Sequence, residues 1–91
     1  MILLPVQSRM ARAALGWGVR ELAAAAKVSI DTVARFERGD ELKERTIEAL
    51  RRTLEAAGVK FIDENGGGAG VRLRKPGNEK SPKLKGLTRR L

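Results

Sequence analysis

Four side chains between positions 30 and 35 can contact the edges of DNA bases, three of them by hydrogen bonds. Arg35 is the sharpest candidate, because a guanidinium group can donate two hydrogen bonds to the O6 and N7 atoms of guanine. Thr32 can contact a thymine methyl group or donate to a base or a phosphate, and Ile30 can touch a thymine methyl or simply pack. Asp31 can accept a hydrogen bond from cytosine N4, but its charge equally suits the first turn of a helix.

A second group of polar side chains, close by in the sequence, suits contacts with phosphate groups. Ser29 can cap a helix N-terminus or bind a phosphate, and one hydroxyl can do both. Arg38 fits a phosphate clamp, with Lys43 and Arg45 beyond it. Candidate nucleic-acid contacts therefore extend over residues 29–45.

Two short helices are predicted to position these side chains. Apolar residues at i, i+3, i+4 and i+7 indicate a helix over residues 19–26. Ser29 offers an N-cap for a second helix over residues 29–38, and Gly39 suits the position after its end. The turn between the helices is only Lys27-Val28, so they must cross steeply, as in a helix-turn-helix. That geometry projects the second helix outward, where it can enter a DNA major groove.

Two more helices and a β-hairpin complete the expected fold. Pro5 suits a first helical position, so the first helix is predicted from Pro5 to Leu15, and a fourth from Glu44 or Arg45 to Ala57. Strands are predicted over residues 59–62 and 71–74, joined by a glycine-rich loop. The residues expected to face inward are Met10, Ala11, Ala14 and Leu15 in the first helix and Ile47, Leu50, Leu54 and Ala57 in the fourth. Val19, Leu22, Ala23 and Ala26 share one face of the second helix, and Ile30, Val33 and Phe36 continue with helical spacing in the third.

The composition excludes several classes of function. The chain of 91 residues has no Cys and no His, which removes disulfides, thiolate chemistry, zinc-finger spacings and the commonest general base. We therefore expect neither an enzyme nor a metal or cofactor site. The apolar opening MILLPV is too short for a signal peptide, and no stretch approaches a membrane-spanning length. We expect a cytoplasmic protein that does not bind membranes.

Positive charge is concentrated in the last quarter of the chain. Of the net charge of +8, residues 1–65 supply little, with 11 Lys and Arg against 10 Asp and Glu, whereas residues 66–91 carry 8 against 1. A basic end attracts polyanions, meaning DNA, RNA or an anionic membrane, and the other interpretation is a solubilising tail. Because residues 76–91 are polar and lack periodicity, we expect a disordered basic tail there.

The stretch from Ser8 to Ile62 resembles the phage repressor/Cro helix-turn-helix family, also called the XRE type. The matching residues are Arg12, Ala14-Leu15-Gly16-Trp17, Glu21-Leu22-Ala23, Val28-Ser29, Thr32-Val33, Arg35-Phe36-Glu37-Arg38-Gly39 and Leu50 to Ala57. The resemblance implies a mainly α fold, with a four- to five-helix repressor-like helix-turn-helix domain over residues 1–58. A short C-terminal β-hairpin over residues 59–75, a candidate dimerisation element, and the tail over residues 76–91 would follow.

The resemblance also implies roles for individual residues. The base-facing positions of the family's third helix, which lies in the major groove, are matched by Ile30, Asp31, Thr32 and Arg35. Arg12 and Glu37 match an ion pair that links the first and third helices in the family and orients the reading helix. Lys27 departs from the family's usual glycine in the turn, and a left-handed conformation there would cost about 1 kcal/mol.

Two functions follow from these expectations. The first is a sequence-specific double-stranded DNA-binding regulator, a repressor, which reads a two-fold symmetric operator as a homodimer through the helix at residues 29–38. The alternative is an antitoxin-type autoregulator whose segment 59–91 binds a partner protein. Phe61 and Leu73 have little helical core left to cover them, so we expect dimerisation through the hairpin, or else packing onto the fourth helix of the same chain. An RNA-binding module is least supported, because one Trp and two Phe provide almost no platform for base stacking.

Overall fold

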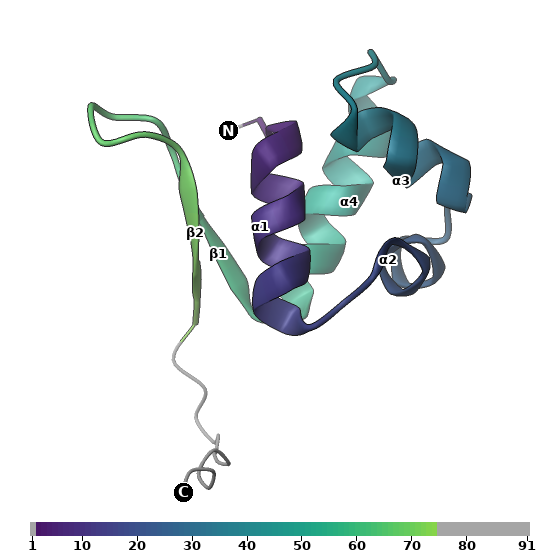
Figure 1. The fold of residues 1–91 in the computed structure, drawn as a ribbon, viewed down its shortest axis with the longest axis horizontal. Coiled ribbons are helices and arrows are strands. Elements are labelled where there is room, and N and C mark those ends of the chain that lie inside the picture. The colour runs from purple at the N-terminus through teal and green to yellow at the C-terminus, as the bar shows by residue number, and fades with distance from the viewer. Residues whose placement is uncertain (1, 75–91) are drawn as a thin grey trace, which may run out of the picture.

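Helices form the body of the molecule, and a two-stranded β-hairpin lies along one side of it. The computed structural model describes residues 2–74. The elements are α1 (Pro5–Leu15), α2 (Val19–Ala26), α3 (Ile30–Glu37), α4 (Glu44–Ala56), β1 (Val59–Ile62) and β2 (Gly70–Leu73). In Figure 1 the hairpin stands beside α1, on the side opposite to α2 and α3. The predicted mainly α chain with a short C-terminal hairpin is thus confirmed, and the tail expected over residues 76–91 lies outside the described residues.

A single apolar core joins the helices to the hairpin. Its buried side chains are Leu3, Ala11, Leu22, Ala23, Val33, Phe36, Leu50, Leu54, Val59 and Phe61. The inward faces predicted for α2 and α4 are largely confirmed, since Leu22, Leu50 and Leu54 are fully buried. Full burial of a leucine side chain stabilises a fold by about 1.5–3 kcal/mol, so these three contribute strongly. Within residues 2–74, none of the helices combines the length and apolar character needed to cross a membrane.

The inner face predicted for the first helix is partly wrong. Ala11 is buried as expected, but Ala14 is exposed and Met10 is only half-buried. Gln7 and Ser8 are buried in their place, at 1% and 0% exposure. Polar side chains are stable in such positions when they are hydrogen-bonded, and apolar periodicity alone does not identify them.

Gln7 attaches the hairpin to α1. Its Nε2 donates to the carbonyl oxygens of Ile62, at 3.0 Å, and Gly70, at 3.1 Å. Its Oε1 accepts a hydrogen bond from the Leu4 backbone N–H at 3.1 Å. The strands are antiparallel, with Ile62 opposite Gly70. The second strand begins at residue 70 and ends at residue 73, so both of its ends lie one residue earlier than predicted.

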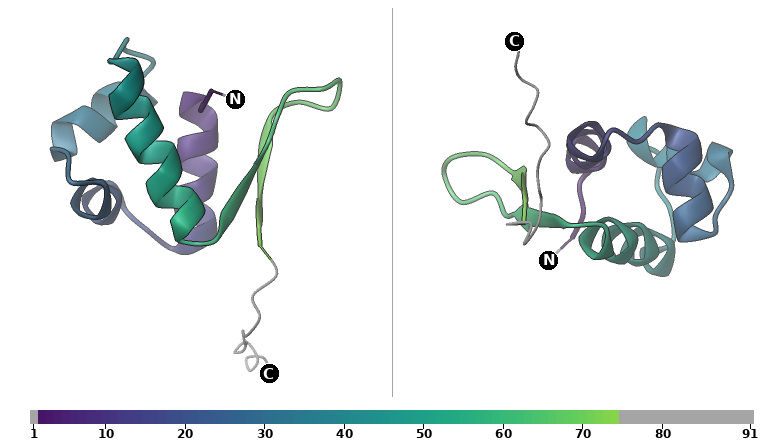
Figure 2. Two further views of the ribbon diagram at one scale, coloured as in Figure 1. Left: turned by 180° about the vertical axis from the view of Figure 1, so that it is seen from behind. Right: turned by 90° about the horizontal axis from the view of Figure 1, so that it is seen from below.

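Phe61 packs within its own chain, as the alternative of packing onto the fourth helix predicts. It is 6% exposed and belongs to the core, because β1 packs against both α1 and α4. Figure 2 shows β1 leaving the end of α4 and running back beside α1. Leu73, at the open end of the same strand pair, is 51% exposed.

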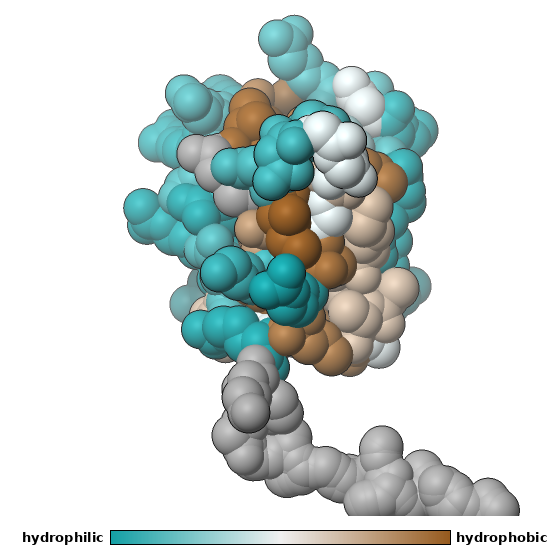
Figure 3. Space-filling model, turned by 90° about the vertical axis from the view of Figure 1, so that its left-hand side faces the viewer, coloured by the Kyte–Doolittle hydropathy of each residue, from teal (hydrophilic) through white to brown (hydrophobic). Residues whose placement is uncertain are grey.

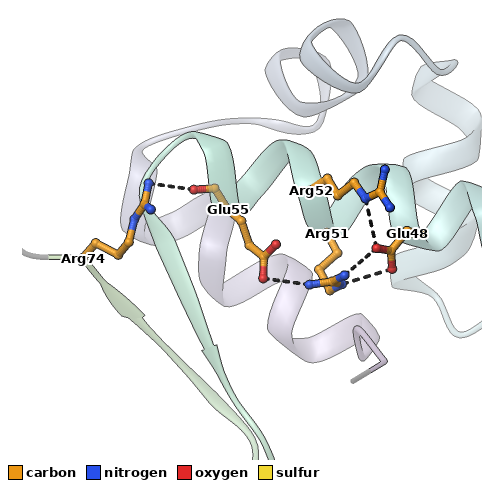
Figure 4. A network of polar contacts seen from close by, with 5 residues as sticks. All are labelled: Glu48, Arg51, Arg52, Glu55 and Arg74. Atoms are coloured by element: carbon orange, nitrogen blue, oxygen red, sulfur yellow. Dashed lines mark hydrogen bonds and ion pairs between the residues drawn. The ribbon is translucent and has the colours of Figure 1, made fainter.

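The outward side of α4 carries a network of ion pairs (Figure 4). Arg51 pairs with Glu48 and with Glu55, the latter at 2.8 Å, while Arg52 pairs with Glu48 at 3.0 Å. Arg74, just after β2, donates to the Glu55 carbonyl oxygen at 3.0 Å. Exposed ion pairs add little stability, but the last contact connects the end of β2 to the last turn of α4.

Candidate nucleic-acid interface

The turn between α2 and α3 determines the direction of α3. In Figure 1 α2 is seen almost end-on, whereas α3 runs across the view, so the two helices cross steeply. Lys27 has φ 61° and ψ 43°, and in residues 2–74 it is the one non-glycine residue with positive φ. The left-handed conformation expected at this position is therefore present. A side chain in this conformation costs about 1 kcal/mol relative to glycine.

Ser29 caps α3 and leaves a hydroxyl hydrogen available. Its Oγ accepts the Thr32 backbone N–H at 3.0 Å and lies 2.8 Å from Thr32 Oγ1. One of the two hydroxyl hydrogens is used between these oxygens, so the other can donate to a phosphate. Asp31 places negative charge in the first turn, where it stabilises the helix N-terminus.

The outer face of α3 presents charged side chains. Asp31, Arg35 and Arg38 follow one another at i, i+4 and i+7, and therefore line one side of the helix. The opposite side is buried through Val33, at 0% exposure. Ile30 is 45% exposed, because it lies about a quarter turn from the centre of the buried face, so of its two expected roles packing in the core is not the one the structure shows. Its exposure leaves it accessible to a ligand of the outer face.

Asp40 holds both arginines of this face, a contact that sequence reasoning missed. Its Oδ2 lies 3.1 Å from Arg38 Nη2 and 3.6 Å from Arg35 Nε. Gly39, with φ 99°, turns the chain so that the Asp40 N–H donates to the Arg35 carbonyl oxygen at 3.0 Å. The sequence signal was an acidic residue directly after the glycine that ends the helix. All three side chains remain near half-exposed, so an anion can displace the carboxylate.

The remaining predicted phosphate contacts lie at the start of α4. Lys43 precedes the helix and Arg45 lies in its first turn, and both are exposed. Glu41 and Glu44, also exposed, lie beside them in the sequence. This end of the surface is therefore mixed in charge, and any phosphate contact there depends on the position of single side chains.

Glu37, at the end of α3, is the centre of a buried polar network with α1. Its Oε2 accepts from Ser8 Oγ at 2.6 Å and from Arg12 Nε at 2.9 Å, and its Oε1 accepts from Arg12 Nη2 at 2.7 Å. Arg12 Nη1 also donates to the Trp17 carbonyl oxygen at 3.2 Å, and Arg9 donates to the Glu37 carbonyl oxygen. The pair implied for Arg12 and Glu37 is thus present as a bidentate ion pair, and it joins α1, the residues before α2 and the end of α3.

The pKa values of this network report strong pairing. Burial alone would raise the pKa of the Glu37 carboxyl group, but the hydrogen bonds from Arg12 and Ser8 outweigh it and lower the pKa. The hydrogen bond to Glu37 raises the pKa of the Arg12 guanidinium group. Both groups therefore stay ionised at neutral pH. The network fixes the orientation of α3 from its buried side while leaving the outer face free.

Comparison of the chain with protein-family models gave no match, and a search of curated proteins gave none either. The candidate interface is therefore defined by its geometry and chemistry: an exposed helix face with two arginines, a capped N-terminus and a bidentate ion pair behind it.

Proposed function

We propose that this protein is a sequence-specific regulator that binds double-stranded DNA through a helix-turn-helix of the phage repressor type. The observation that carries the proposal is the outer face of α3, where Arg35 and Arg38 are accessible while Glu37 is held from behind by Arg12. A rigid helix with accessible donors suits the major groove, which admits an α-helix and displays a distinct pattern for each base pair.

The residues of α3 divide into two roles under this proposal. Arg35 reads guanine with two parallel hydrogen bonds, while Ile30 and Thr32 contact the bases beside it, with Asp31 either accepting from cytosine or stabilising the helix. The phosphate contacts, which position the helix without reading sequence, come from Ser29, Arg38, Lys43 and Arg45. Because Asp40 lies against Arg35 and Arg38 in the free protein, DNA binding exchanges that carboxylate for a base edge or a phosphate.

The protein acts as a homodimer in the cytoplasm. One reading helix covers only a few base pairs, so useful specificity needs two half-sites related by two-fold symmetry. A dimer bound to such an operator represses transcription by occupying the site.

The proposal is tested by Arg35→Ala. Specific affinity should fall by about 1–3 kcal/mol, and the preference should relax at one position of each half-site. The matched control is Lys60→Ala, which removes one exposed positive charge from β1, on the side of α1 away from α3. If the two variants lose affinity equally for all sequences, Arg35 contributes charge alone and the base-reading role is wrong. Circular dichroism of both variants checks that the helices are intact.

A further inference from the structure

An apolar strip remains exposed where β2 lies against α1. The residues of this α1–β2 strip are Val6, Met10, Ala13 and Ala14 on α1, and Val71 and Leu73 on β2, of which Met10 and Val71 are half-buried. Val6 is 39% exposed and Leu73 is 51% exposed. Figure 3, which views the hairpin side of the molecule, shows strongly hydrophobic residues running down the middle of this face, with hydrophilic residues on one side and mostly weakly hydrophobic ones on the other. Single exposed apolar residues are common, but a continuous strip rimmed by polar residues indicates an interaction surface.

The strip borders a strand edge with unpaired backbone groups. Antiparallel strands alternate between residues that exchange hydrogen bonds and residues that do not. The Arg74 N–H donates to the Gly58 carbonyl oxygen at 2.7 Å, and the register pairs Arg72 with Lys60. By alternation, the N–H and C=O groups of Val71 and Leu73 point away from β1. In residues 2–74 the sheet has only these two strands, so this edge is open to pairing with another strand.

We propose that a second copy of this chain covers the α1–β2 strip by antiparallel pairing of the two β2 strands about a two-fold axis at Val71. The four strands then form one sheet in the order β1-β2-β2-β1, and each copy covers the exposed Leu73 of the other. The inference names the surface through which the proposed dimer forms, so it rests on the proposed function for the need for two copies. The surface itself is argued from the hairpin and α1.

The charges of the hairpin favour a second copy in this register. Pairing about Val71 places Arg72 opposite Gly70 of the second copy, so no like charges meet. Beyond the end of the strand it brings Arg74 toward the loop of the second copy that contains Gly68, whose N–H is bound by the Glu64 carboxylate at 3.2 Å. At each end of the paired strands, the Arg74 side chain of one copy then approaches the Glu64 carboxylate of the other. An axis at Arg72 would instead bring two arginines directly opposite each other, which destabilises a sheet.

The guanidinium group of Arg74, although bound to α4, keeps N–H donors for this contact. In the single chain one of its nitrogens donates to the Glu55 carbonyl oxygen, and a guanidinium group has five N–H donors. Glu64, which lies in the exposed loop between the strands, accepts a hydrogen bond from the Gly68 backbone N–H and retains lone pairs for a second donor.

The placement of α3 is compatible with this dimer. The hairpin and α3 lie on opposite sides of α1 (Figure 1), so pairing through β2 leaves both copies of α3 uncovered. Two outward-facing reading helices related by a two-fold axis are what a symmetric operator requires.

The test is sedimentation of the full chain without DNA across a wide range of concentrations. The chain should sediment as a dimer, and Leu73→Asp should weaken dimerisation by at least about tenfold, because it buries a carboxylate without a partner. The matched control, Ala24→Asp, adds the same charge at an exposed alanine of α2 and should leave the dimer unchanged. A chain that stays monomeric, or a Leu73→Asp variant that sediments like the unmodified chain, overturns the proposal.

A charge exchange tests the register and remains informative if Leu73→Asp does not fold. Arg74→Glu and Glu64→Arg should each weaken the dimer, and the two changes together should restore it. Failure of the double variant to recover overturns the axis at Val71. The experiment is independent of DNA: a chain that dimerises through β2 and binds no duplex refutes the proposed function alone, and a monomeric chain that still binds DNA through Arg35 refutes only this interface.

Discussion

Replacing Glu37 with glutamine should lower the free energy of unfolding by about 2 kcal/mol at neutral pH. The carboxylate accepts three hydrogen bonds, one from Ser8 Oγ at 2.6 Å and two from Arg12 at 2.7 and 2.9 Å. A glutamine keeps one acceptor oxygen, so its amide nitrogen must face an Arg12 N–H and one charge-assisted bond is lost. Such a bond contributes about 1.5–3 kcal/mol. The Arg12 side chain is 18% exposed, which admits some water and favours the lower part of that range.

The difference between the two proteins should depend on pH in a defined direction. Burial alone would raise the pKa of Glu37, but the hydrogen bonds from Arg12 and Ser8 lower it below the unfolded value of about 4.3. The contribution of this carboxylate to stability is therefore fully present above the unfolded pKa and is lost as the pH falls through the folded pKa. Because a protonated glutamic acid resembles glutamine, the stability difference should shrink as the pH falls through the acid range.

The assay is urea unfolding followed by far-UV circular dichroism, for both proteins, over a series of pH values from neutral to acid. The matched control is Glu48→Gln, which removes the carboxylate of a more exposed network on α4. That change should cost less than Glu37→Gln, because solvent-exposed ion pairs contribute little. A loss for Glu37→Gln no larger than the control, or one that stays constant with pH, would show that the network does not hold α3.

Three further changes test other parts of the structure. Lys27→Gly should raise the free energy of unfolding by about 1 kcal/mol by removing the left-handed strain, and an unchanged or lower value in urea unfolding contradicts that assignment. Gln7→Leu removes both side-chain hydrogen bonds to the hairpin, so backbone amides of β1 and β2 should exchange with solvent faster while those of α4 do not. Equal protection in both proteins would show that Gln7 is not the anchor. Asp40→Asn removes the carboxylate charge beside Arg35, so it should raise DNA affinity for all sequences and weaken discrimination at the base that Arg35 reads. Unchanged affinity would mean that Asp40 does not compete with DNA.

Local features of the sequence were sufficient to predict the helices and their caps. The Ser29 cap, the end of α3 near Gly39 and the inward leucines of α4 each depend on residues within two turns, so a single sequence contains the signal. The left-handed Lys27 was predicted through the family resemblance, since it stands where the turn of that family usually has a glycine.

The polar interior could not be predicted in the same way. Gln7 is buried because its amide reaches two carbonyl oxygens more than fifty residues away, and Ser8 is buried because Glu37 accepts its hydroxyl. Both contacts depend on how distant elements pack, which apolar spacing does not describe. The choice between a second protomer and the fourth helix as the cover of Phe61 stayed open for the same reason, because that cover comes from two helices distant in sequence. The ion pair between Asp40 and Arg35 differs from these contacts, because its partners are close in sequence. It was missed although Asp40 directly follows the glycine that ends the helix.

The central claim, that α3 reads DNA sequence as one half of a dimer, is tested most directly by selecting bound fragments from random duplex DNA with the full chain. We expect enrichment of two half-sites related by two-fold symmetry, with centres one helical turn apart, about 10–10.5 base pairs, or a multiple of it. Each half-site should contain a guanine whose preference is lost in Arg35→Ala. Recovery of no enriched sequence, or of one whose preference is the same for Arg35→Ala, would contradict the account.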